Sequence, residues 1–165
     1  MQRPRPDRPG PGQESVWDYP RPPRLERTDR RIRAYVNGEC IADTTRAYRV
    51  LETSHPPTYY VPPEDVRLDL VVPGKGSSHC EWKGRAEYFD AVLEGRRFPR
   101  VAWTYPEPTR GFLPIREYLA FYLPNLDEGF VDDERAKAQP GGFYGGWITA
   151  DLAGPFKGEP GSWGW

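Results

Sequence analysis

Prolines and glycines divide this chain into short segments along its whole length. There are 20 prolines and 17 glycines among 165 residues, more than a globular chain usually carries. Proline breaks helices and removes a donor from central strands, whereas glycine favours turns. Aromatic residues are also abundant, at 14%, so the chain has large side chains with which to build a core. The combination excludes a helical bundle and predicts short strands joined by many turns.

Alternating residues predict the position of the first hairpin. Ile32, Ala34 and Val36 alternate with polar or amphipathic residues, and Asn37-Gly38 follows them. Asn-Gly between two such runs is a strong hairpin signal, because both turn positions need a positive φ. Further strands are expected at 48–51, 58–61, 68–72, 78–82, 86–93, 101–105 and 147–150, with a second hairpin at 130–136.

One segment has helical periodicity. Apolar residues recur at spacings of three and four from Ile115 to Tyr122, and this run is bounded by Pro114 and Pro124. Proline suits the first turn of a helix and also ends one. The pattern therefore predicts one short α-helix over 114–123.

The expected fold is mainly β, because strands do not alternate with helices as they would in a parallel sheet. Trp17 and Tyr19 lie in a proline-flanked stretch near the N-terminus and are expected to anchor an extended arm on the body. Four segments result: a disordered, Pro/Arg-rich tail at 1–13, an extended arm at 14–30, a single β domain at 31–153, and a Gly/Pro/Trp-rich tail at 154–165.

Charge and hydropathy exclude several classes of protein. The net charge is −1, so general binding to nucleic acid is not expected despite the arginines of residues 1–33. The sequence contains no run of about 18 apolar residues that would predict a membrane span. The first residues contain no apolar stretch that would predict export. We therefore expect a cytoplasmic protein with Cys40 and Cys80 as reduced thiols. We expect neither a cofactor nor a metal, since Cys40, His55, His79 and Cys80 are too few and poorly spaced for zinc.

Two stretches place aromatic residues beside glycines, namely 79–84 and 141–147. Glycine lets a backbone or a ligand come close to a ring. Open rings bind flat or cationic molecules, so we expect a pocket for a nucleoside-like or amine ligand. Trp82 and Trp147 are expected to line one cavity, with Lys83 or Glu52 at its rim. The expected ligand-binding residues are Tyr60, Trp82, Lys83, Trp103, Tyr105, Tyr144 and Trp147.

An enzyme is the main alternative. Glu52 could orient His55 as a general base, and Cys80 could serve as a nucleophile. This hypothesis predicts that a carboxylate or the Cys80 sulfur lies within about 3.5 Å of His55. The carboxylates near Asp65 and Asp69 are weaker candidates for a metal-dependent transfer reaction. A module that binds a protein partner through its N-terminal arm is the third hypothesis, and it predicts a large exposed apolar patch.

The same stretches resemble a bacterial family known as domain of unknown function 427. The resemblance covers nearly all of the chain from residue 14 onward and rests on 15–20, 49–57, 59–60, 63–66, 80–84, 102–106 and 141–147. It implies a β-tent (Mss4-like) fold, in which two antiparallel sheets of short strands pack at an angle. That group includes cereblon-type domains that hold a ligand in a tryptophan cage. The family has also been labelled a nucleotidyltransferase, and the zinc cysteines of many β-tent proteins are absent here.

Overall fold

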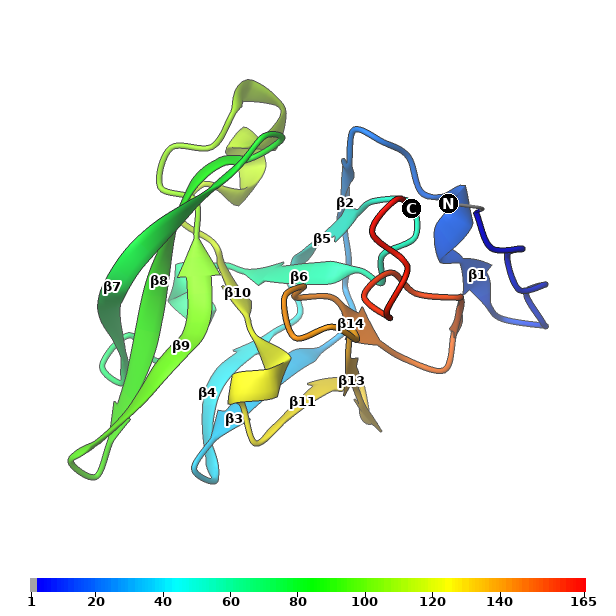
Figure 1. The fold of residues 1–165 in the computed structure, drawn as a ribbon. Coiled ribbons are helices and arrows are strands. Elements are labelled where there is room, and N and C mark those ends of the chain that lie inside the picture. Colours follow the sequence, from blue (N-terminus) through cyan, green and yellow to red (C-terminus); the bar gives the residue numbers. More distant parts are fainter. Residues whose placement is uncertain (1–2) are drawn as a thin grey trace.

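Antiparallel strands are the main regular structure of the computed structural model, which describes residues 3–165 (Figure 1). The larger sheet has seven strands in the order β2–β5–β6–β10–β9–β8–β7, and all of its neighbouring strands are antiparallel. Its strands are β2 (Arg24–Arg27), β5 (Tyr48–Leu51), β6 (Thr58–Val61), β7 (Val71–Cys80), β8 (Gly84–Leu93), β9 (Arg96–Thr104) and β10 (Leu119–Phe121).

The smaller sheet has four strands in the order β12–β11–β3–β4. Two short pairs complete the fold: β1 runs parallel to β15, and β13 runs antiparallel to β14. The mainly β prediction is confirmed. These strands are β1 (Glu14–Ser15), β3 (Ile32–Val36), β4 (Glu39–Thr44), β11 (Glu128–Val131), β12 (Glu134–Arg135), β13 (Lys137–Ala138), β14 (Trp147–Ile148) and β15 (Leu152–Ala153).

The predicted Asn-Gly hairpin joins β3 to β4. Asn37 has a φ of 50° and Gly38 a φ of 78°, so both turn residues occupy the left-handed region that this kind of turn requires. Glu94 and Gly95 repeat the arrangement between β8 and β9, with φ values of 50° and 75°. Local turn chemistry therefore determines where both hairpins reverse.

The predicted α-helix over 114–123 is wrong. The segment contains the end of a 3₁₀ turn, η3 (Arg110–Ile115), followed by β10 and the start of another 3₁₀ turn, η4 (Leu123–Asn125). Glu117 has a φ of 63°, which no α-helix accommodates. β10 lies between β6 and β9 and is buried on both faces, so it lacks the alternation of apolar and polar residues that would have marked it as a strand. The other 3₁₀ turns are η1 (Val16–Asp18) and η2 (Pro63–Asp65).

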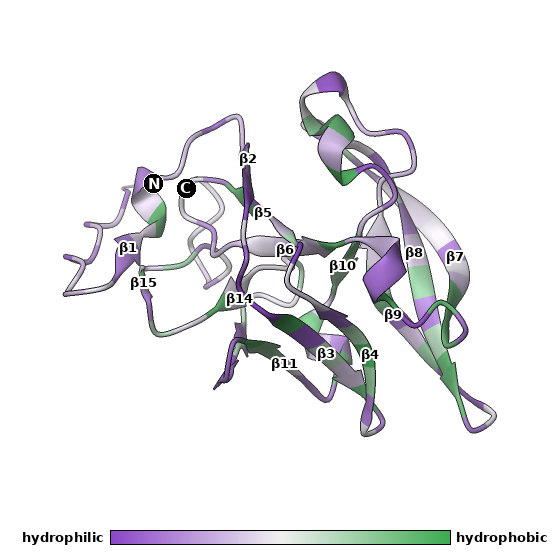
Figure 2. Cartoon of the chain, turned by 180° about the vertical axis from the view of Figure 1, so that it is seen from behind, coloured by the Kyte–Doolittle hydropathy of each residue, from purple (hydrophilic) through white to green (hydrophobic). Residues whose placement is uncertain are grey.

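The two sheets enclose the main hydrophobic core. Figures 1 and 2 show β7–β9 and β3–β4 diverging from each other, with hydrophobic residues along β4, β8 and β9. Leu119 and Phe121 belong to this core, whereas Ala120 between them belongs to a second cluster on the other face of the large sheet. The second cluster includes Tyr60 and Tyr105, and the cavity described below opens over it.

The N-terminal and C-terminal segments lie on the same side of the molecule (Figure 1). Val16 and Tyr19 are buried, and the Trp17 indole N–H donates to the Pro155 carbonyl at 2.9 Å. Trp17 also packs against Trp165, with ring centroids 5.4 Å apart.

Disorder over residues 1–13 stays a prediction, and residues 1–2 lie outside the described range. Within residues 3–13, the Asp7 amide donates to the Gly154 carbonyl, and the Gln13 side chain donates to the Ala150 carbonyl. Across residues 3–165, no helix has the length and hydropathy needed to cross a membrane.

Candidate ligand-binding site

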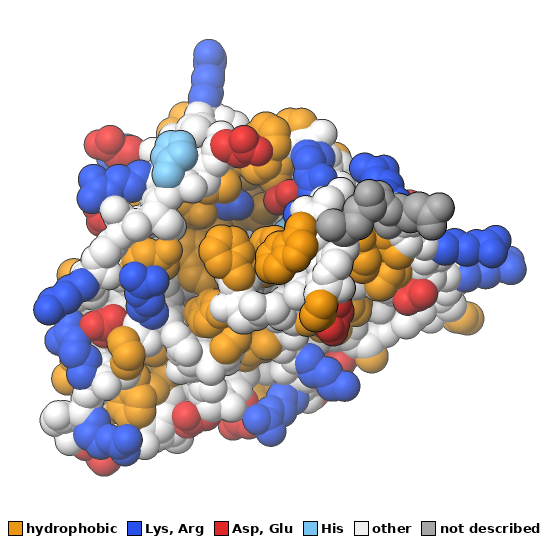
Figure 3. Space-filling model, viewed as in Figure 1, with side chains coloured by type: hydrophobic (Ala, Val, Ile, Leu, Met, Phe, Trp, Pro, Cys, Tyr) orange, Lys and Arg blue, Asp and Glu red, His pale blue; other side chains and the backbone are white. Residues whose placement is uncertain are grey.

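A cavity of about 670 Å³ lies on the face of the large sheet that carries the second cluster. Strands β5 to β9 provide the largest share of its wall, and the loops between β5 and β6 and between β13 and β14 provide much of the remainder. Figure 3 shows the hollow, with hydrophobic side chains gathered around it and Lys or Arg atoms visible within it. Its aromatic lining consists of Tyr60, Tyr88, Trp103, Tyr105, Tyr122, Phe143 and Tyr144.

Tyr60, Trp103 and Tyr105 form a buried or half-buried group at one side of the cavity. The Trp103 indole N–H donates to the Tyr60 hydroxyl at 3.3 Å, and these two rings are perpendicular, with centroids 6.3 Å apart. The Tyr60 and Tyr105 rings are also 6.3 Å apart. Burial raises the pKa of both phenols well above the ordinary value. Both side chains are therefore neutral at pH 7 and present apolar ring surface with a polar hydroxyl.

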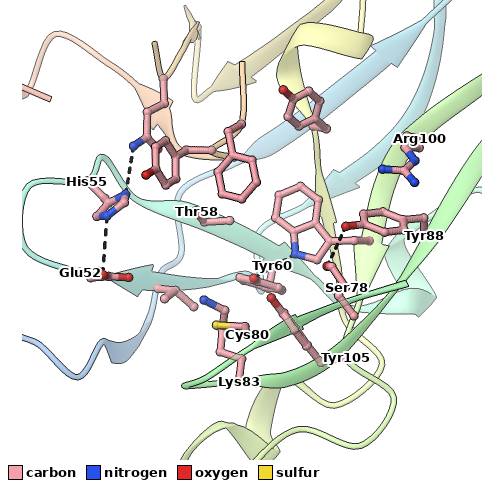
Figure 4. Close-up of a pocket in the computed structure, with 18 of the residues that line it drawn as sticks. Glu52, His55, Thr58, Tyr60, Ser78, Cys80, Lys83, Tyr88, Arg100 and Tyr105 are labelled. Carbon is pink, nitrogen blue, oxygen red and sulfur yellow. Dashed lines mark hydrogen bonds and ion pairs between the residues drawn. The ribbon is translucent and has the colours of Figure 1, made fainter. Parts of the chain in front are cut away.

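The β13–β14 loop contributes a second aromatic group. Phe143 is exposed, and its ring meets the ring of Tyr144 edge-on with centroids 5.1 Å apart. The loop is attached to the large sheet through the Tyr122 hydroxyl, which donates to the Gly142 carbonyl. On the sheet itself, the Tyr88 hydroxyl donates to Ser78 Oγ at 2.7 Å (Figure 4). Aromatic side chains from separate elements thus converge on one cavity.

Gly145 lets Trp103 lie directly against the backbone of this loop. A Cβ at position 145 would approach the Trp103 ring to 2.2 Å, which is far inside van der Waals contact. The glycine beside this ring therefore makes room for one of the protein's own side chains. The sequence predicted that glycine would clear space for a ring, but it could not identify which ring.

Glu52 and His55 lie together in the cavity wall, as the enzyme hypothesis required (Figure 4). The His55 Nε2 is 3.6 Å from the Glu52 carboxylate, slightly beyond the predicted 3.5 Å. The other ring nitrogen, Nδ1, lies 3.0 Å from the side-chain nitrogen of Gln139. Nδ1 is therefore hydrogen-bonded within the protein, and Nε2 faces the Glu52 carboxylate just beyond hydrogen-bond distance.

Gln139 determines which nitrogen of His55 carries the proton. Its side-chain oxygen accepts from the Gly146 amide at 3.1 Å, and its nitrogen donates to the Lys157 carbonyl at 2.9 Å. A flipped amide would face donor to donor and acceptor to acceptor, so its orientation is fixed by the backbone. The amide nitrogen can then only donate to His55 Nδ1. The ring is therefore the tautomer with its hydrogen on Nε2, directed at Glu52.

Burial lowers the pKa of His55 from 6.5 to about 4, and the attraction of Glu52 opposes this shift without overcoming it. Lys157, Arg21 and Lys83 lower the pKa further through their positive charges. The imidazole is neutral at pH 7. With Nδ1 occupied and Nε2 protonated, His55 is a hydrogen-bond donor in this arrangement.

Cys80 and Lys83 both line the cavity, at the end of β7 and in the turn that leads to β8. Figure 4 shows Lys83 beside Cys80 and below Tyr60. The Lys83 ammonium lies 5.8 Å from the centroid of the Tyr105 ring. Thr109 holds this turn by donating its hydroxyl to the Trp82 carbonyl and its amide to the Lys83 carbonyl.

The expectation that Trp82 and Trp147 line one cavity is wrong. Trp147 is 2% exposed, and its indole N–H donates to the Phe121 carbonyl at 3.1 Å in the main core. Trp82 packs against the second cluster and is not among the residues that line the cavity. Glycine does lie beside Trp147, but that glycine is Gly129, where a Cβ would come within 2.6 Å of the ring.

Several residues of the wall were not expected from the sequence. Gln139 lies in no recognisable motif, and its role depends on a contact with a residue 84 positions away. Arg100 and Lys157 gave no local signal, because an isolated basic residue is usually solvated. The remaining polar lining residues are Thr58, Ser78, His79 and Asn125.

The carboxylates weighed for a metal-dependent reaction are each paired with an arginine. Asp65 pairs with Arg46 at 3.0 Å, and Asp69 pairs with Arg67 at 2.8 Å. Among residues 3–165, no three His, Cys, Asp or Glu side chains are grouped closely enough to hold a metal ion. Cys40 and Cys80 are free thiols.

A family model described as a domain of unknown function (DUF427) matches residues 24–132, which is more than half of the chain. The matched range contains the second cluster, nearly all of the main core and most of the cavity wall, whereas Ala136, Trp147 and the β13–β14 loop lie beyond it. No curated protein matches the chain.

Proposed function

Because the chain belongs to the DUF427 family, whose description names no activity, we propose a function from the cavity: the protein binds a small planar organic molecule. The observation that carries this proposal is the convergence of aromatic side chains from several strands and one loop on a single hollow of about 670 Å³. Cavities that bind small organic ligands are usually of 300–1,000 Å³, with mostly apolar walls and a few polar groups.

The wall is suited to a flat ligand in particular. Trp103 and Tyr105 offer ring surface in fixed positions, since Trp103 rests on Gly145 and donates to Tyr60. Rings held in this way lose little conformational entropy when a ligand stacks on them. The Glu52 carboxylate and the Cys80 thiol add polar groups to the wall.

We do not assign acid–base catalysis to His55. A general base needs an unprotonated nitrogen within reach of the substrate, whereas Nδ1 of His55 accepts from Gln139 and Nε2 carries the hydrogen. Using Nε2 as a base would require the other tautomer, in which Nδ1 carries a hydrogen that would face the Gln139 donor. His55 is better suited to orienting Glu52 or donating to a bound molecule.

The β-tent arrangement and a cytoplasmic setting are part of the same proposal. Sheets that diverge around a core support the first, although likeness of fold alone does not assign a ligand. Two free thiols support a reducing compartment.

A thermal-shift panel tests the proposal. Planar bicyclic compounds such as indole, quinoline and naphthalene derivatives are compared with their saturated counterparts of equal size. We expect the planar members to stabilise the fold, by about 2.7 kcal/mol at a hundred times the dissociation constant, and the saturated members to have little effect. Equal stabilisation by both series, or by neither, contradicts planar recognition.

A pair of tryptophan variants locates the site. Trp103→Phe should weaken binding by about tenfold because it removes stacking surface, for which losses of about 1–3 kcal/mol are typical in aromatic–base stacking. Trp147→Phe is the matched control, because it alters the main core without touching the cavity. It should lower stability and leave affinity per folded molecule unchanged. The opposite pattern would place the ligand elsewhere.

A further inference from the structure

We infer that the planar ligand is an anion, such as an aromatic carboxylate, whose negative group pairs with Lys83. The inference rests on the proposed function and adds the charge of the ligand to it. Three basic side chains line the cavity, Lys83, Arg100 and Lys157, against one carboxylate, Glu52. The sequence had suggested a flat or cationic ligand, and this distribution of charge favours the opposite sign.

The one carboxylate of the wall is already neutralised by a neighbour. Arg21 holds the Glu52 carboxylate at 3.0 Å and also donates to the Trp165 carbonyl. His55, on the other side of Glu52, carries no charge at pH 7. A cationic ligand would therefore have to compete with Arg21 for Glu52, at a site where the surrounding charges oppose it.

Lys83 is the half-buried basic residue of the wall whose side chain has no hydrogen-bond partner among residues 3–165, whereas the other half-buried one, Lys157, donates to the Trp165 carbonyl. No carboxylate in residues 3–165 lies within ion-pair distance of the Lys83 ammonium. This ammonium lies over the face of the Tyr105 ring, 5.8 Å from the ring centroid. A partly desolvated cation attracts an anion more strongly than an exposed one does, because less water screens it.

The backbone around Lys83 is already in position. Thr109 clamps the turn by two hydrogen bonds, and Gly84 adopts a φ of 102° that lets the chain enter β8. Trp82 packs into the second cluster and fixes the other side of the turn. The ammonium therefore needs only side-chain ordering to meet a ligand, which lowers the entropic cost of binding.

The other two basic residues have different roles. Lys157 donates to the Trp165 carbonyl at 3.3 Å. Arg100 is exposed, with its guanidinium 4.4 Å from the centroid of the Tyr88 ring. Figure 4 places Arg100 and Lys83 on different sides of the aromatic group. A planar molecule that stacks on this group beside Tyr105 thus meets Lys83 at its edge.

Three indole compounds that differ chiefly in charge test the sign of the charge that the cavity prefers in its ligand. Indole-3-acetate is anionic, indole-3-acetamide is neutral and tryptamine is cationic, and matched naphthalene and quinoline series extend the panel to other rings. We expect each anion to bind about tenfold more tightly than its neutral amide, as for a single charge-assisted hydrogen bond, and the cation to bind most weakly. Tightest binding by the cation or the amide overturns the inference and leaves the proposed function standing. Absence of binding by every ring series overturns both.

Substitution of Lys83 tests whether this residue causes the preference for the anion. Lys83→Gln should bring the affinity for the anion to within about twofold of that for the amide, and Lys83→Arg should retain the preference. The amide affinity of the same variant reports whether the cavity is intact. Lys137→Gln, an exposed lysine on β13 outside the cavity wall, should change nothing. An undiminished preference for the anion in Lys83→Gln would refute the assignment to Lys83.

Discussion

The side-chain amide of Gln139 donates to Nδ1 of His55 at 3.0 Å and thereby fixes the tautomer of the imidazole. The two residues are far apart in sequence, and Gln139 is itself fixed by the Gly146 amide and the Lys157 carbonyl. The same contact links the loop between β5 and β6, which carries His55, to the β13–β14 loop. It therefore also joins two walls of the cavity. Because of this contact, His55 faces Glu52 as a hydrogen-bond donor and does not act as a general base.

Acidification should destabilise the protein through His55. The folded-state pKa is about 4, below the ordinary 6.5, so the unfolded chain takes up a proton before the folded chain does. The stability that His55 contributes is complete above pH 6.5 and is lost progressively as the pH falls toward 4. The loss should be about 3 kcal/mol in total, measured by urea unfolding at pH 7, 6, 5 and 4.

Two variants isolate this effect. His55→Gln removes the titrating group and should flatten the dependence between pH 6.5 and 4.5. His79→Gln, at the chain's other histidine, alters an exposed side chain of β7 and should leave the slope as in the unmodified protein. A His55→Gln slope equal to that of the unmodified protein would show that other groups cause the acid sensitivity.

Packing around Gly129 should tolerate no methyl group. Gly129→Ala would bring a Cβ to 2.6 Å from the Trp147 ring and 2.9 Å from Leu123. Overpacking of this kind costs about 1–3 kcal/mol. Gly111→Ala is the matched control because nothing lies within 4 Å of the added atom. Its melting temperature should stay the same or rise slightly, and similar losses in both variants would argue against a packed contact at Gly129.

The N-terminal arm should contribute to stability only from residue 14 onward. Deleting residues 1–13 should leave the melting temperature unchanged. Deleting residues 1–20 also removes Val16 and Tyr19, which are 0% and 6% exposed, and should cost about 3 kcal/mol for two buried side chains. Thermal unfolding of the two truncated proteins distinguishes them, and equal melting temperatures would mean that the arm contributes nothing.

Local signals predicted much of the fold. Asn37-Gly38 needs no distant partner to favour a turn, and the alternating pattern beside it needs only one buried face. The segment 114–123 failed because β10 is buried on both faces, and a strand of that kind has no alternation to detect.

The sequence predicted several of the residues that line the cavity, but not all of them. Tyr60, Trp103, Tyr105 and Tyr144 do line it, together with Lys83. The sequence could not tell a tryptophan of the cavity from a tryptophan of the core, because both lie near glycines. That distinction depends on tertiary contacts, in which Gly145 adjoins Trp103 and Gly129 adjoins Trp147.

The indole N–H groups of Trp103 and Trp147 give the most direct test of the proposed site. The first donates to the Tyr60 hydroxyl within the cavity, and the second donates to the Phe121 carbonyl in the core. In a titration of ¹⁵N-labelled protein with unlabelled indole-3-acetate, we expect the Trp103 indole resonance to shift until it saturates, while the Trp147 resonance stays in place. Saturable binding that leaves the Trp103 resonance unmoved would contradict a planar-ligand site in this cavity.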